Sequence, residues 1–330
     1  MDQFRPYRTS QEVRDRYAEV SLSPFDFIVP YFVVEGEGVR SEILTLSGVF
    51  HYSIDELTKE VDTLLLLGIN KVLLFGVVDS SHKDPLGRSS YEDDPLIARA
   101  VRVLKKTFPS ILVFTDVCVC GYTDHGHCGL LSTTEPLHTV DNDATLPVLA
   151  RMALAHARAG ADYVSPSAMM DNQVSAIREL LDTEGLTSTK IMAYSAKYAS
   201  GLYGPFRGAV NSAPSFGDRK TYQMDFRTRE QGVAEARADV EEGADMLMVK
   251  PAHTYLDMIS LIKQQFPMQP LSAYHVSGEY MMIKTGAKAG IFDEPAVMIE
   301  VLTAIKRAGA DLIISYYAKE AVALLSKKSS

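Results

Sequence analysis

Two lysines in this sequence follow apolar runs of residues. Lys250 ends the run MLMVK, and Lys197 comes just after KIMAYS. A lysine in such a place is ordinarily a strand-end side chain whose amine extends into water, and Lys197, within YSAKYAS, fits that interpretation better than Lys250 does. An apolar setting can instead keep the amine partly neutral, so that it attacks a ketone and forms a Schiff base. Two lysines at adjacent strand ends favour this second interpretation, because each positive charge lowers the pKa of the other.

The three cysteines of the chain, Cys118, Cys120 and Cys128, lie close together in the sequence. Their spacing lacks the fourth ligand of a zinc ribbon. Three thiolates would form an open metal site in which water or substrate is the fourth ligand, and the alternative is a set of small buried cysteines. The polar surroundings of Cys128, DHGHCG, weaken that alternative. His125 and His127 in the same stretch are expected to be solvated loop residues rather than metal ligands. The second possibility is that they lie next to the metal ligands and support them.

A long segment, residues 198–224, is rich in glycine, proline and aromatic residues. This composition suits an ordered flap that closes over an active site. Arg207 and Arg219 in the flap could hold a carboxylate through paired hydrogen bonds, although arginines in loops are as often simply exposed. Ser277 in HVSGEY and Tyr316 in ISYY add hydroxyl groups at two later strand ends.

A short pattern that recurs four times indicates how these residues are positioned. A helical stretch ends at glycine, a small or branched residue and Asp or Asn follow, and an apolar run begins. The glycine is typical of a helix C-cap, and the run, apolar on both faces, is typical of a strand in a parallel sheet. The four copies are Gly68–Asn70, Gly160–Asp162, Gly243–Asp245 and Gly309–Asp311.

Eight apolar runs are predicted strands that alternate with predicted helices. The strands are expected near Phe27–Val33, Lys71–Val77, Ile111–Val117, Asp162–Pro166, Lys190–Ser195, Asp245–Lys250, Leu271–Val276 and Asp311–Tyr316. The helices are expected near Ile54–Leu67, Pro95–Phe108, Asp143–Ala159, Asn172–Thr183, Arg229–Glu242, Tyr255–Phe266, Pro295–Ala308 and Lys319–Ser326. This strict alternation predicts an α/β fold, a closed (β/α)8 TIM barrel, rather than an open doubly wound sheet. The absence of Gly-x-Gly-x-x-Gly after the first strand also argues against a dinucleotide-binding fold.

The chain has 330 residues, which suits two ordinary domains or one barrel with about 80 residues over. No linker rich in Ser, Gly or Pro divides it, so we predict a single catalytic barrel domain over residues 27–330. The surplus is assigned to an N-terminal arm, residues 1–26, and to two insertions, 121–140 and 198–224. The active site of a TIM barrel lies at the carboxyl ends of its strands, where both lysines are predicted to lie.

The composition excludes several classes of protein. With 46% hydrophobic and 23% charged residues, the chain is neither disordered nor collagen-like. Its 33 basic and 42 acidic residues give a net charge of −9, which argues against a nucleic-acid or anionic-membrane partner. The start, MDQFRPYRTS, lacks the apolar stretch of a secretory signal, and no apolar run reaches about 20 residues. An odd, clustered set of cysteines is a poor disulfide framework, so a cytoplasmic protein is predicted.

The motifs together resemble the porphobilinogen synthase (5-aminolevulinate dehydratase) family. The stretches DVCVCGYTDHGHCGLL, SPSAMMDNQV, AYSAKYASGLYGPFRGA, FGDRKTYQMD, GADMLMVKPA, YHVSGEY and ISYYAKE carry the resemblance, in this order over residues 116–320. RPYR and PYFV near the start resemble the family as well. Enzymes of this family join two molecules of 5-aminolevulinate into the pyrrole porphobilinogen with loss of two waters, a lyase reaction of tetrapyrrole biosynthesis.

The resemblance implies a role for each candidate residue. Lys250 would form a Schiff base with the substrate molecule that becomes the propionate side of the product, and Lys197 with the molecule at the acetate side. The matched carboxylate-binding residues are Ser277 and Tyr316 for the first molecule, and Arg207 and Arg219, with Gln223 nearby, for the second.

The resemblance also implies two metals and an assembly. The three cysteines match the zinc-dependent subgroup of the family, and Asp116 matches an acidic residue beside that metal. Glu235 matches a glutamate that binds an activating, allosteric magnesium ion at a subunit boundary. The arm, residues 1–26, matches the segment by which subunits of the family embrace one another, usually in octamers.

Two positions depart from the family pattern. Ala168 replaces the first acid of Ser-Asp-Met-Met-Asp, and Leu202 stands where an aromatic residue is common beside Lys197. Neither is a Schiff-base lysine, so affinity rather than the reaction is expected to change. The alternative enzyme is a class I aldolase-like barrel with one working lysine and another keto acid as substrate. A third possibility is that the protein is not an enzyme but a non-catalytic barrel whose cysteines hold zinc.

Overall fold

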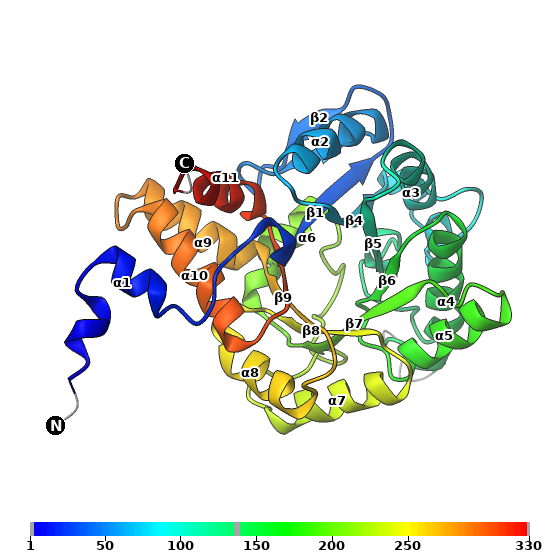
Figure 1. The fold of residues 1–330 in the computed structure, drawn as a ribbon. Helices are drawn as coiled ribbons and strands as arrows, with labels where there is room; N and C mark the ends of the chain where they lie inside the picture. The colour runs from blue at the N-terminus through cyan, green and yellow to red at the C-terminus, as the bar shows by residue number, and fades with distance from the viewer. Residues whose placement is uncertain (1–2, 135–138, 329–330) are drawn as a thin grey trace.

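A computed structural model describes residues 3–134 and 139–328, and in it eight parallel strands close into a barrel (Figure 1). Each strand pairs with its neighbours, and the ring is closed where Phe27 pairs with Ile313. The eight strands are β1 (Phe27–Val34), β4 (Lys71–Val77), β5 (Leu112–Val117), β6 (Tyr163–Pro166), β7 (Lys190–Lys197), β8 (Met246–Lys250), β9 (Leu271–His275) and β10 (Leu312–Ser315). The predicted TIM barrel is therefore confirmed.

Helices between successive strands form the outer layer of the barrel (Figure 1). They are α2 (Ile54–Leu66), α3 (Leu96–Thr107), α4 (Asn142–Arg158), α5 (Gln173–Thr183), α7 (Glu230–Glu241), α8 (Leu256–Gln265), α10 (Glu294–Ala308) and α11 (Ala318–Lys328). Each lies within a residue or two of its predicted bounds. The apolar stripe of α2, for example, places Leu57, Val61 and Leu64 in the core with no exposed surface, a burial that contributes about 1.5–3 kcal/mol for each side chain.

The recurring glycine pattern has a structural reason at both of its ends. Gly160 has a φ of +101°, in the left-handed region, so it ends α4 at low cost. Asp162 then accepts a hydrogen bond of 2.8 Å from the backbone N–H of Val113 in the preceding strand. Asp245 does the same for Ile191, as Asp311 does for Leu271, also at 2.8 Å. These aspartates bind neighbouring strands together at the amino end of the barrel.

The structure also contains elements that the sequence pattern did not predict. Two three-residue strands, β2 (Arg40–Glu42) and β3 (Phe50–Tyr52), form a hairpin after β1. A short helix, α6 (Gly204–Ala209), lies within the flap, and a full helix, α9 (Ser277–Lys288), follows β9 directly. The surplus length is thus spread over more places than an arm and two insertions. Glycines 278 and 286 inside α9 weaken its helical signal in the sequence.

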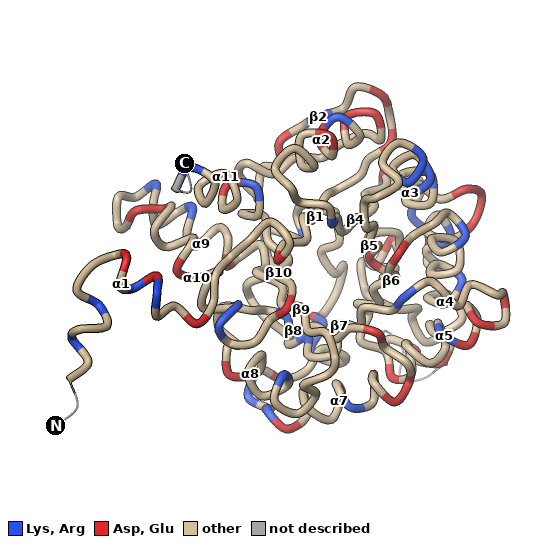
Figure 2. Tube along the Cα trace, in the orientation of Figure 1, with Lys and Arg blue, Asp and Glu red and all other residues tan. Residues whose placement is uncertain are grey.

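The N-terminal arm extends away from the barrel (Figure 1). Its short helix α1 (Gln11–Arg16) has no buried residue, and Phe4, Tyr7 and Tyr17 are 64%, 47% and 56% exposed. Where the arm meets the barrel, Asp26 forms an ion pair with Lys306 of α10. Basic and acidic residues are interspersed along the arm and the outer helices (Figure 2). No helix within the described ranges is both long and apolar enough to cross a membrane.

Candidate active site

The two lysines are the last residues of adjacent strands and pair with each other in the sheet register, Lys197 opposite Lys250. Each residue is only 5% exposed, so neither amine extends into water. Lys197 Nζ donates a hydrogen bond to the backbone carbonyl of Ser167, at the end of the neighbouring strand β6. The placement of two lysines at adjacent strand ends, which their sequence positions predicted, is therefore present in the structure.

A bulge in β7 explains how Lys197 reaches the barrel interior. Its amine lies 5.6 Å from the ring centre of Tyr194. The two residues are three apart, and strict alternation along a strand would place them on opposite faces. The register with β8 shifts between Ala193 and Ala196, and a shift of this kind re-aims the side chains that follow it.

The amine of Lys250 lies among aromatic rings. Four ring centres are close to its Nζ: Tyr274 at 4.2 Å, Tyr194 at 5.0 Å, Phe206 at 5.2 Å and Tyr203 at 5.4 Å. Burial lowers the pKa of Lys250 to about 7, and the positive charge of Lys197 contributes to that fall. A substantial fraction of the amine is therefore neutral, and nucleophilic, near neutral pH.

Asp116, in β5, is a buried acid close to both lysines. Burial raises its pKa to about 6, against the opposing effects of a hydrogen bond with Ser167 and of the positive charges of Lys197 and Lys250. Its buried Oδ1 has no hydrogen-bond partner in the described part of the protein. A carboxyl group in this state can take up and release a proton close to neutral pH.

The three cysteines follow β5 and come together at the same end of the barrel. The Sγ atoms of Cys118, Cys120 and Cys128 all lie within 4.8 Å of one another, and all three residues are buried. Hydrogen bonds from the other two thiols lower the pKa of Cys128, and the charge of Arg219 lowers it further. A compact set of soft sulfur donors that includes a thiolate is suited to bind a metal ion.

His125 and His127 are buried, so the expectation that they are solvated is wrong. They are 6% and 3% exposed. The ring nitrogens of His127 lie 3.1 Å from the Tyr222 hydroxyl and 3.1 Å from the Phe216 carbonyl, both in the flap. His125 accepts a hydrogen bond of 3.1 Å from the backbone N–H of His127. His127 therefore fastens the cysteine loop to the flap, because the flap supplies the polar partners that water would otherwise provide, and His125 braces the loop from within.

The flap carries two arginines and a glutamine into the same region. Arg219 is 5% exposed and donates to the carbonyls of Gly126, at 2.9 Å, and Ser212, at 2.6 Å. The buried Nε atoms of Arg207 and Arg219 have no partner among the described residues, and neither does either amide atom of Gln223, which is 3% exposed. Buried donors without a partner are costly, so these groups are arranged for a polar ligand.

The two hydroxyl residues lie at the ends of β9 and β10, which are neighbours in the barrel. The Tyr316 hydroxyl is 3.2 Å from that of Tyr274, whose ring is beside Lys250. The Ser277 hydroxyl accepts a hydrogen bond of 3.0 Å from the N–H of Phe206 and donates one of 3.3 Å to the carbonyl of Leu202. Ser277 therefore connects the start of α9 to residues 202 and 206 of the flap.

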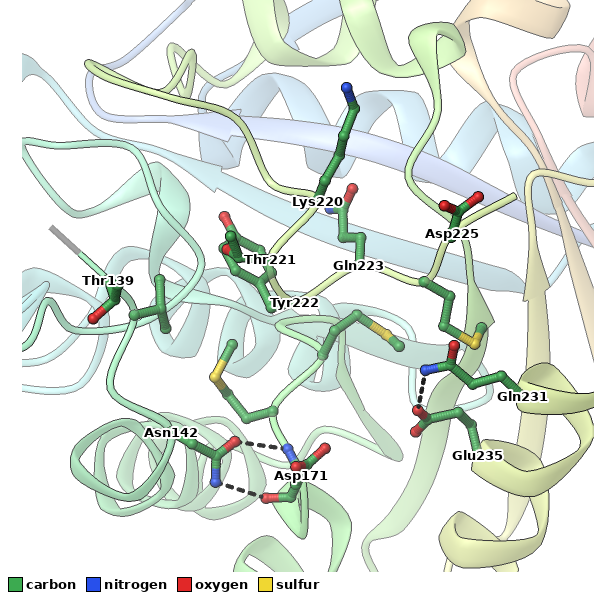
Figure 3. Close-up of a pocket in the computed structure, with 14 residues that line it drawn as sticks. Thr139, Asn142, Asp171, Lys220, Thr221, Tyr222, Gln223, Asp225, Gln231 and Glu235 are labelled. Carbon is green, nitrogen blue, oxygen red and sulfur yellow. Dashed lines mark hydrogen bonds between the residues drawn. The ribbon is translucent and has the colours of Figure 1, made fainter. Parts of the chain in front are cut away.

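Glu235, on α7, faces a pocket of about 610 Å³ beside the flap (Figure 3). Asp171 lines the same pocket, and a smaller one of about 180 Å³ adds Asp239 and Glu242. Burial raises the pKa of Glu235, and the neighbouring acids raise it further, while a hydrogen bond from Gln231 partly offsets the rise. Glu235 is therefore half-buried among other acids, and is not an ordinary solvated side chain.

The aromatic rings around Lys250 are the functional candidates that the sequence pattern missed. Tyr194 and Tyr274 lie inside predicted strands, where aromatic residues are common. A tyrosine at such a position therefore does not by itself indicate a place in the active site. The period-2 alternation that places every second residue of β9 in the barrel interior could have indicated Tyr274.

Comparison with known proteins shows a match along the whole chain. Residues 1–324 match the family described as delta-aminolevulinic acid dehydratase. The delta-aminolevulinic acid dehydratases of Bacillus subtilis and Helicobacter pylori are 47% and 45% identical, over 99% and 98% of this chain and 98% of each relative. The crystal structure of the enzyme from Toxoplasma gondii, in complex with the reaction product porphobilinogen, has a TM-score of 0.94 and 43% identity, over 99% of this chain and 92% of that one.

Proposed function

Because this chain belongs to the delta-aminolevulinic acid dehydratase family, we propose that its two buried lysines perform the family's condensation of two 5-aminolevulinate molecules to porphobilinogen. The chain is a lyase of tetrapyrrole biosynthesis, and the reaction releases two waters. The observation that carries the proposal is the pairing of Lys197 with Lys250 across adjacent strands. One buried lysine serves an aldolase-type reaction on a single ketone, whereas two neighbouring amines can hold two ketones at once.

The neutral amine of Lys250 attacks the ketone of the first substrate, and Lys197 forms a Schiff base with the second. Each Schiff base forms with loss of water, and its protonated form makes the neighbouring carbon acidic. Holding two ketones side by side replaces a dilute encounter of two molecules by a local reaction, an advantage of about 7–11 kcal/mol at best. Asp116 lies near both amines and is the group we assign to proton transfer.

Both substrate molecules are carboxylates, which gives the cationic and hydroxyl groups their role. We assign Ser277 and Tyr316 to the carboxylate of the molecule on Lys250, since both lie at the neighbouring strand ends. Arg207, Arg219 and Gln223 are assigned to the carboxylate of the molecule on Lys197, because the flap brings their unpartnered buried atoms to the site. The local cations outweigh the net charge of −9 at this one end of the barrel.

We assign the cysteine cluster to zinc, because three sulfur donors leave one tetrahedral position open. When bound, such an ion can polarise a substrate oxygen or lower the pKa of its water toward about 7. Arg219 then offsets part of the negative charge of the thiolates, since its guanidinium lies beside Cys128 and Cys120.

We further assign Glu235 to an allosteric magnesium ion, with Asp171 across the same pocket, since hard cations prefer carboxylate oxygens. The arm is assigned to oligomer formation, as an octamer. Its exposed Phe4, Tyr7 and Tyr17 would be buried against another subunit, which explains why aromatic residues are retained on a segment without a core of its own.

Pyrrole formation from 5-aminolevulinate tests the assignment of the lysines. Lys250→Ala and Lys197→Ala should each abolish product, because each removes one nucleophile. The matched control is Lys190→Ala at the opposite end of β7, an exposed lysine that should leave the rate within about twofold of the parent, as surface changes usually do. Product formation by Lys197→Ala at the parent rate would show that one lysine suffices and would favour the aldolase-like mechanism.

A further inference from the structure

Glu279 is a buried acid, 1% exposed, that takes no part in the chemistry assigned above. It lies in the first turn of α9, which begins just after β9. Its carboxylate accepts four hydrogen bonds, all from backbone N–H groups. Oε2 accepts from Val276 at 2.9 Å and Ala252 at 3.3 Å, and Oε1 from His253 at 2.6 Å and Thr254 at 3.3 Å.

Helix capping accounts for only one of these bonds. An acid at the third position of a helix commonly reaches back to the N–H of the residue before the helix, here Val276. The other three donors, residues 252–254, belong to the loop after β8 and lie 25 to 27 positions away in the sequence. A carboxylate that serves only as a cap does not need to be buried or to bind a second loop.

The two loops joined by Glu279 carry the two groups that would hold one substrate molecule. Residues 252–254 are separated from Lys250 only by Pro251, and Val276 precedes Ser277. The carbonyl of Lys250 is also held, by the N–H of Tyr198 at 3.0 Å and the hydroxyl of Tyr203 at 3.2 Å. The backbone on both sides of this lysine is therefore fixed by hydrogen bonds.

The start of α9 also packs tightly against the backbone of the flap. A Cβ atom on Gly278 would lie 2.4 Å from the carbonyl oxygen of Leu202 and 2.6 Å from its Cα. The start of α9 thus abuts the flap backbone, and Ser277 bonds to the same segment. A displacement of the start of α9 would move Ser277 and the flap relative to Lys250.

We propose that Glu279 is a positioning residue that sets the separation between the Lys250 amine and the Ser277 hydroxyl by bonding the β8 and β9 loops to one carboxylate. The inference rests on the proposed function, in that it assumes both groups bind one substrate molecule. Four backbone donors on one buried carboxyl group hold the two loops at a single point. Burial raises the pKa of Glu279 to about 7 while the four bonds oppose that rise, so above pH 7 the group is charged and its hydrogen bonds are about twice as strong as neutral ones.

The variant Glu279→Gln tests this role. Its amide NH2 would face two of the four N–H donors, so the β8 and β9 loops lose part of their connection. We expect a loss of about 10- to 100-fold in kcat/KM, because a shift of about 1 Å at the reacting atoms has effects of that size. Borohydride trapping of 5-aminolevulinate on Lys250 should fall in parallel, whereas trapping on Lys197, which these loops do not carry, should fall less.

The matched control is Asp162→Asn. Asp162 is also an acid that binds a backbone N–H, of Val113, and it lies at the opposite end of the barrel. Both variants should lose thermal stability, and only Glu279→Gln should lose kcat/KM and trapping on Lys250. Equal loss of stability with parent-like kinetics in both would overturn the positioning role. Failure of the parent enzyme to trap substrate on Lys250 would instead overturn the proposed function.

Hydrogen exchange of the parent protein covers the case in which Glu279→Gln does not fold. When substrate is trapped on Lys250, amide exchange should slow together in the peptides that contain residues 251–255 and 274–279, because one carboxylate bonds both loops. Slowing in the first peptide with no change in the second would refute the coupling.

Discussion

The lowered pKa of Lys250 depends in part on the charge of Lys197, so replacing Lys197 should change the pH at which Lys250 reacts. Lysine has an ordinary pKa of about 10.5, and in this site burial and the charge of Lys197 lower the pKa of Lys250 to about 7. The difference of about 3.5 in pKa corresponds to about 5 kcal/mol between the two protonation states. Burial is the larger cause and the charge of Lys197 the smaller, so Lys197→Met should raise the pKa of Lys250 above 7 without restoring it to 10.5.

Only the neutral amine attacks a ketone, so the rate of Schiff-base formation rises with pH through the pKa of the amine. The assay is borohydride trapping of 5-aminolevulinate on Lys250, followed by peptide mass spectrometry across pH 5.5 to 9.5. The parent should reach half its maximal rate near pH 7, and Lys197→Met at a higher pH. Lys190→Met, at the far end of β7, is the matched control and should keep the parental midpoint. A midpoint that does not move, or that falls, in Lys197→Met would refute the coupling between the two amines.

Three further predictions concern metal, substrate and stability. Cys128→Ser should lose bound zinc, measured by atomic emission on the purified protein, and an unchanged zinc content would contradict the sulfur site. Gln223→Ala should raise KM for 5-aminolevulinate by about 10- to 100-fold, because its buried amide lacks another partner, and an unchanged KM would remove it from the site. Burial lowers the pKa of His156 to about 3, so below pH 6.5 the unfolded state binds a proton that the folded state excludes. His156 should therefore contribute a loss of stability of up to about 1.4 kcal/mol per pH unit as the pH falls below 6.5, and urea unfolding should show that the parent loses more stability over this range than His156→Gln does.

The barrel was predictable because its signals are local. The Gly-x-Asp steps mark where each helix ends and each strand begins, and the structure adds their second role. The side chains of Asp162, Asp245 and Asp311 bind the preceding strand. The hairpin β2–β3 was not predicted, since three-residue strands are too short to show a period. Helix α9 was not predicted because its position depends on contacts with the β8 loop and the flap, which lie far away in the sequence.

The candidate site was predictable where side-chain type alone indicates chemistry. Lysines at strand ends and clustered cysteines are unusual enough to be singled out from their positions. The burial of His125 and His127 was not predictable, because their partners, Tyr222 and Phe216, come from a distant flap. The role of Glu279 was hidden for the same reason, since its three additional donors belong to another loop.

If two lysines hold two substrate molecules at once, the number of lysines that can be trapped with substrate is two. The enzyme is incubated with saturating 5-aminolevulinate, reduced with borohydride and digested, and the labelled peptides are identified by mass. We expect label on both Lys250 and Lys197, with single substitution of either lysine leaving label on the other. Label confined to one lysine at every substrate concentration, with pyrrole formed at the normal rate, would contradict it.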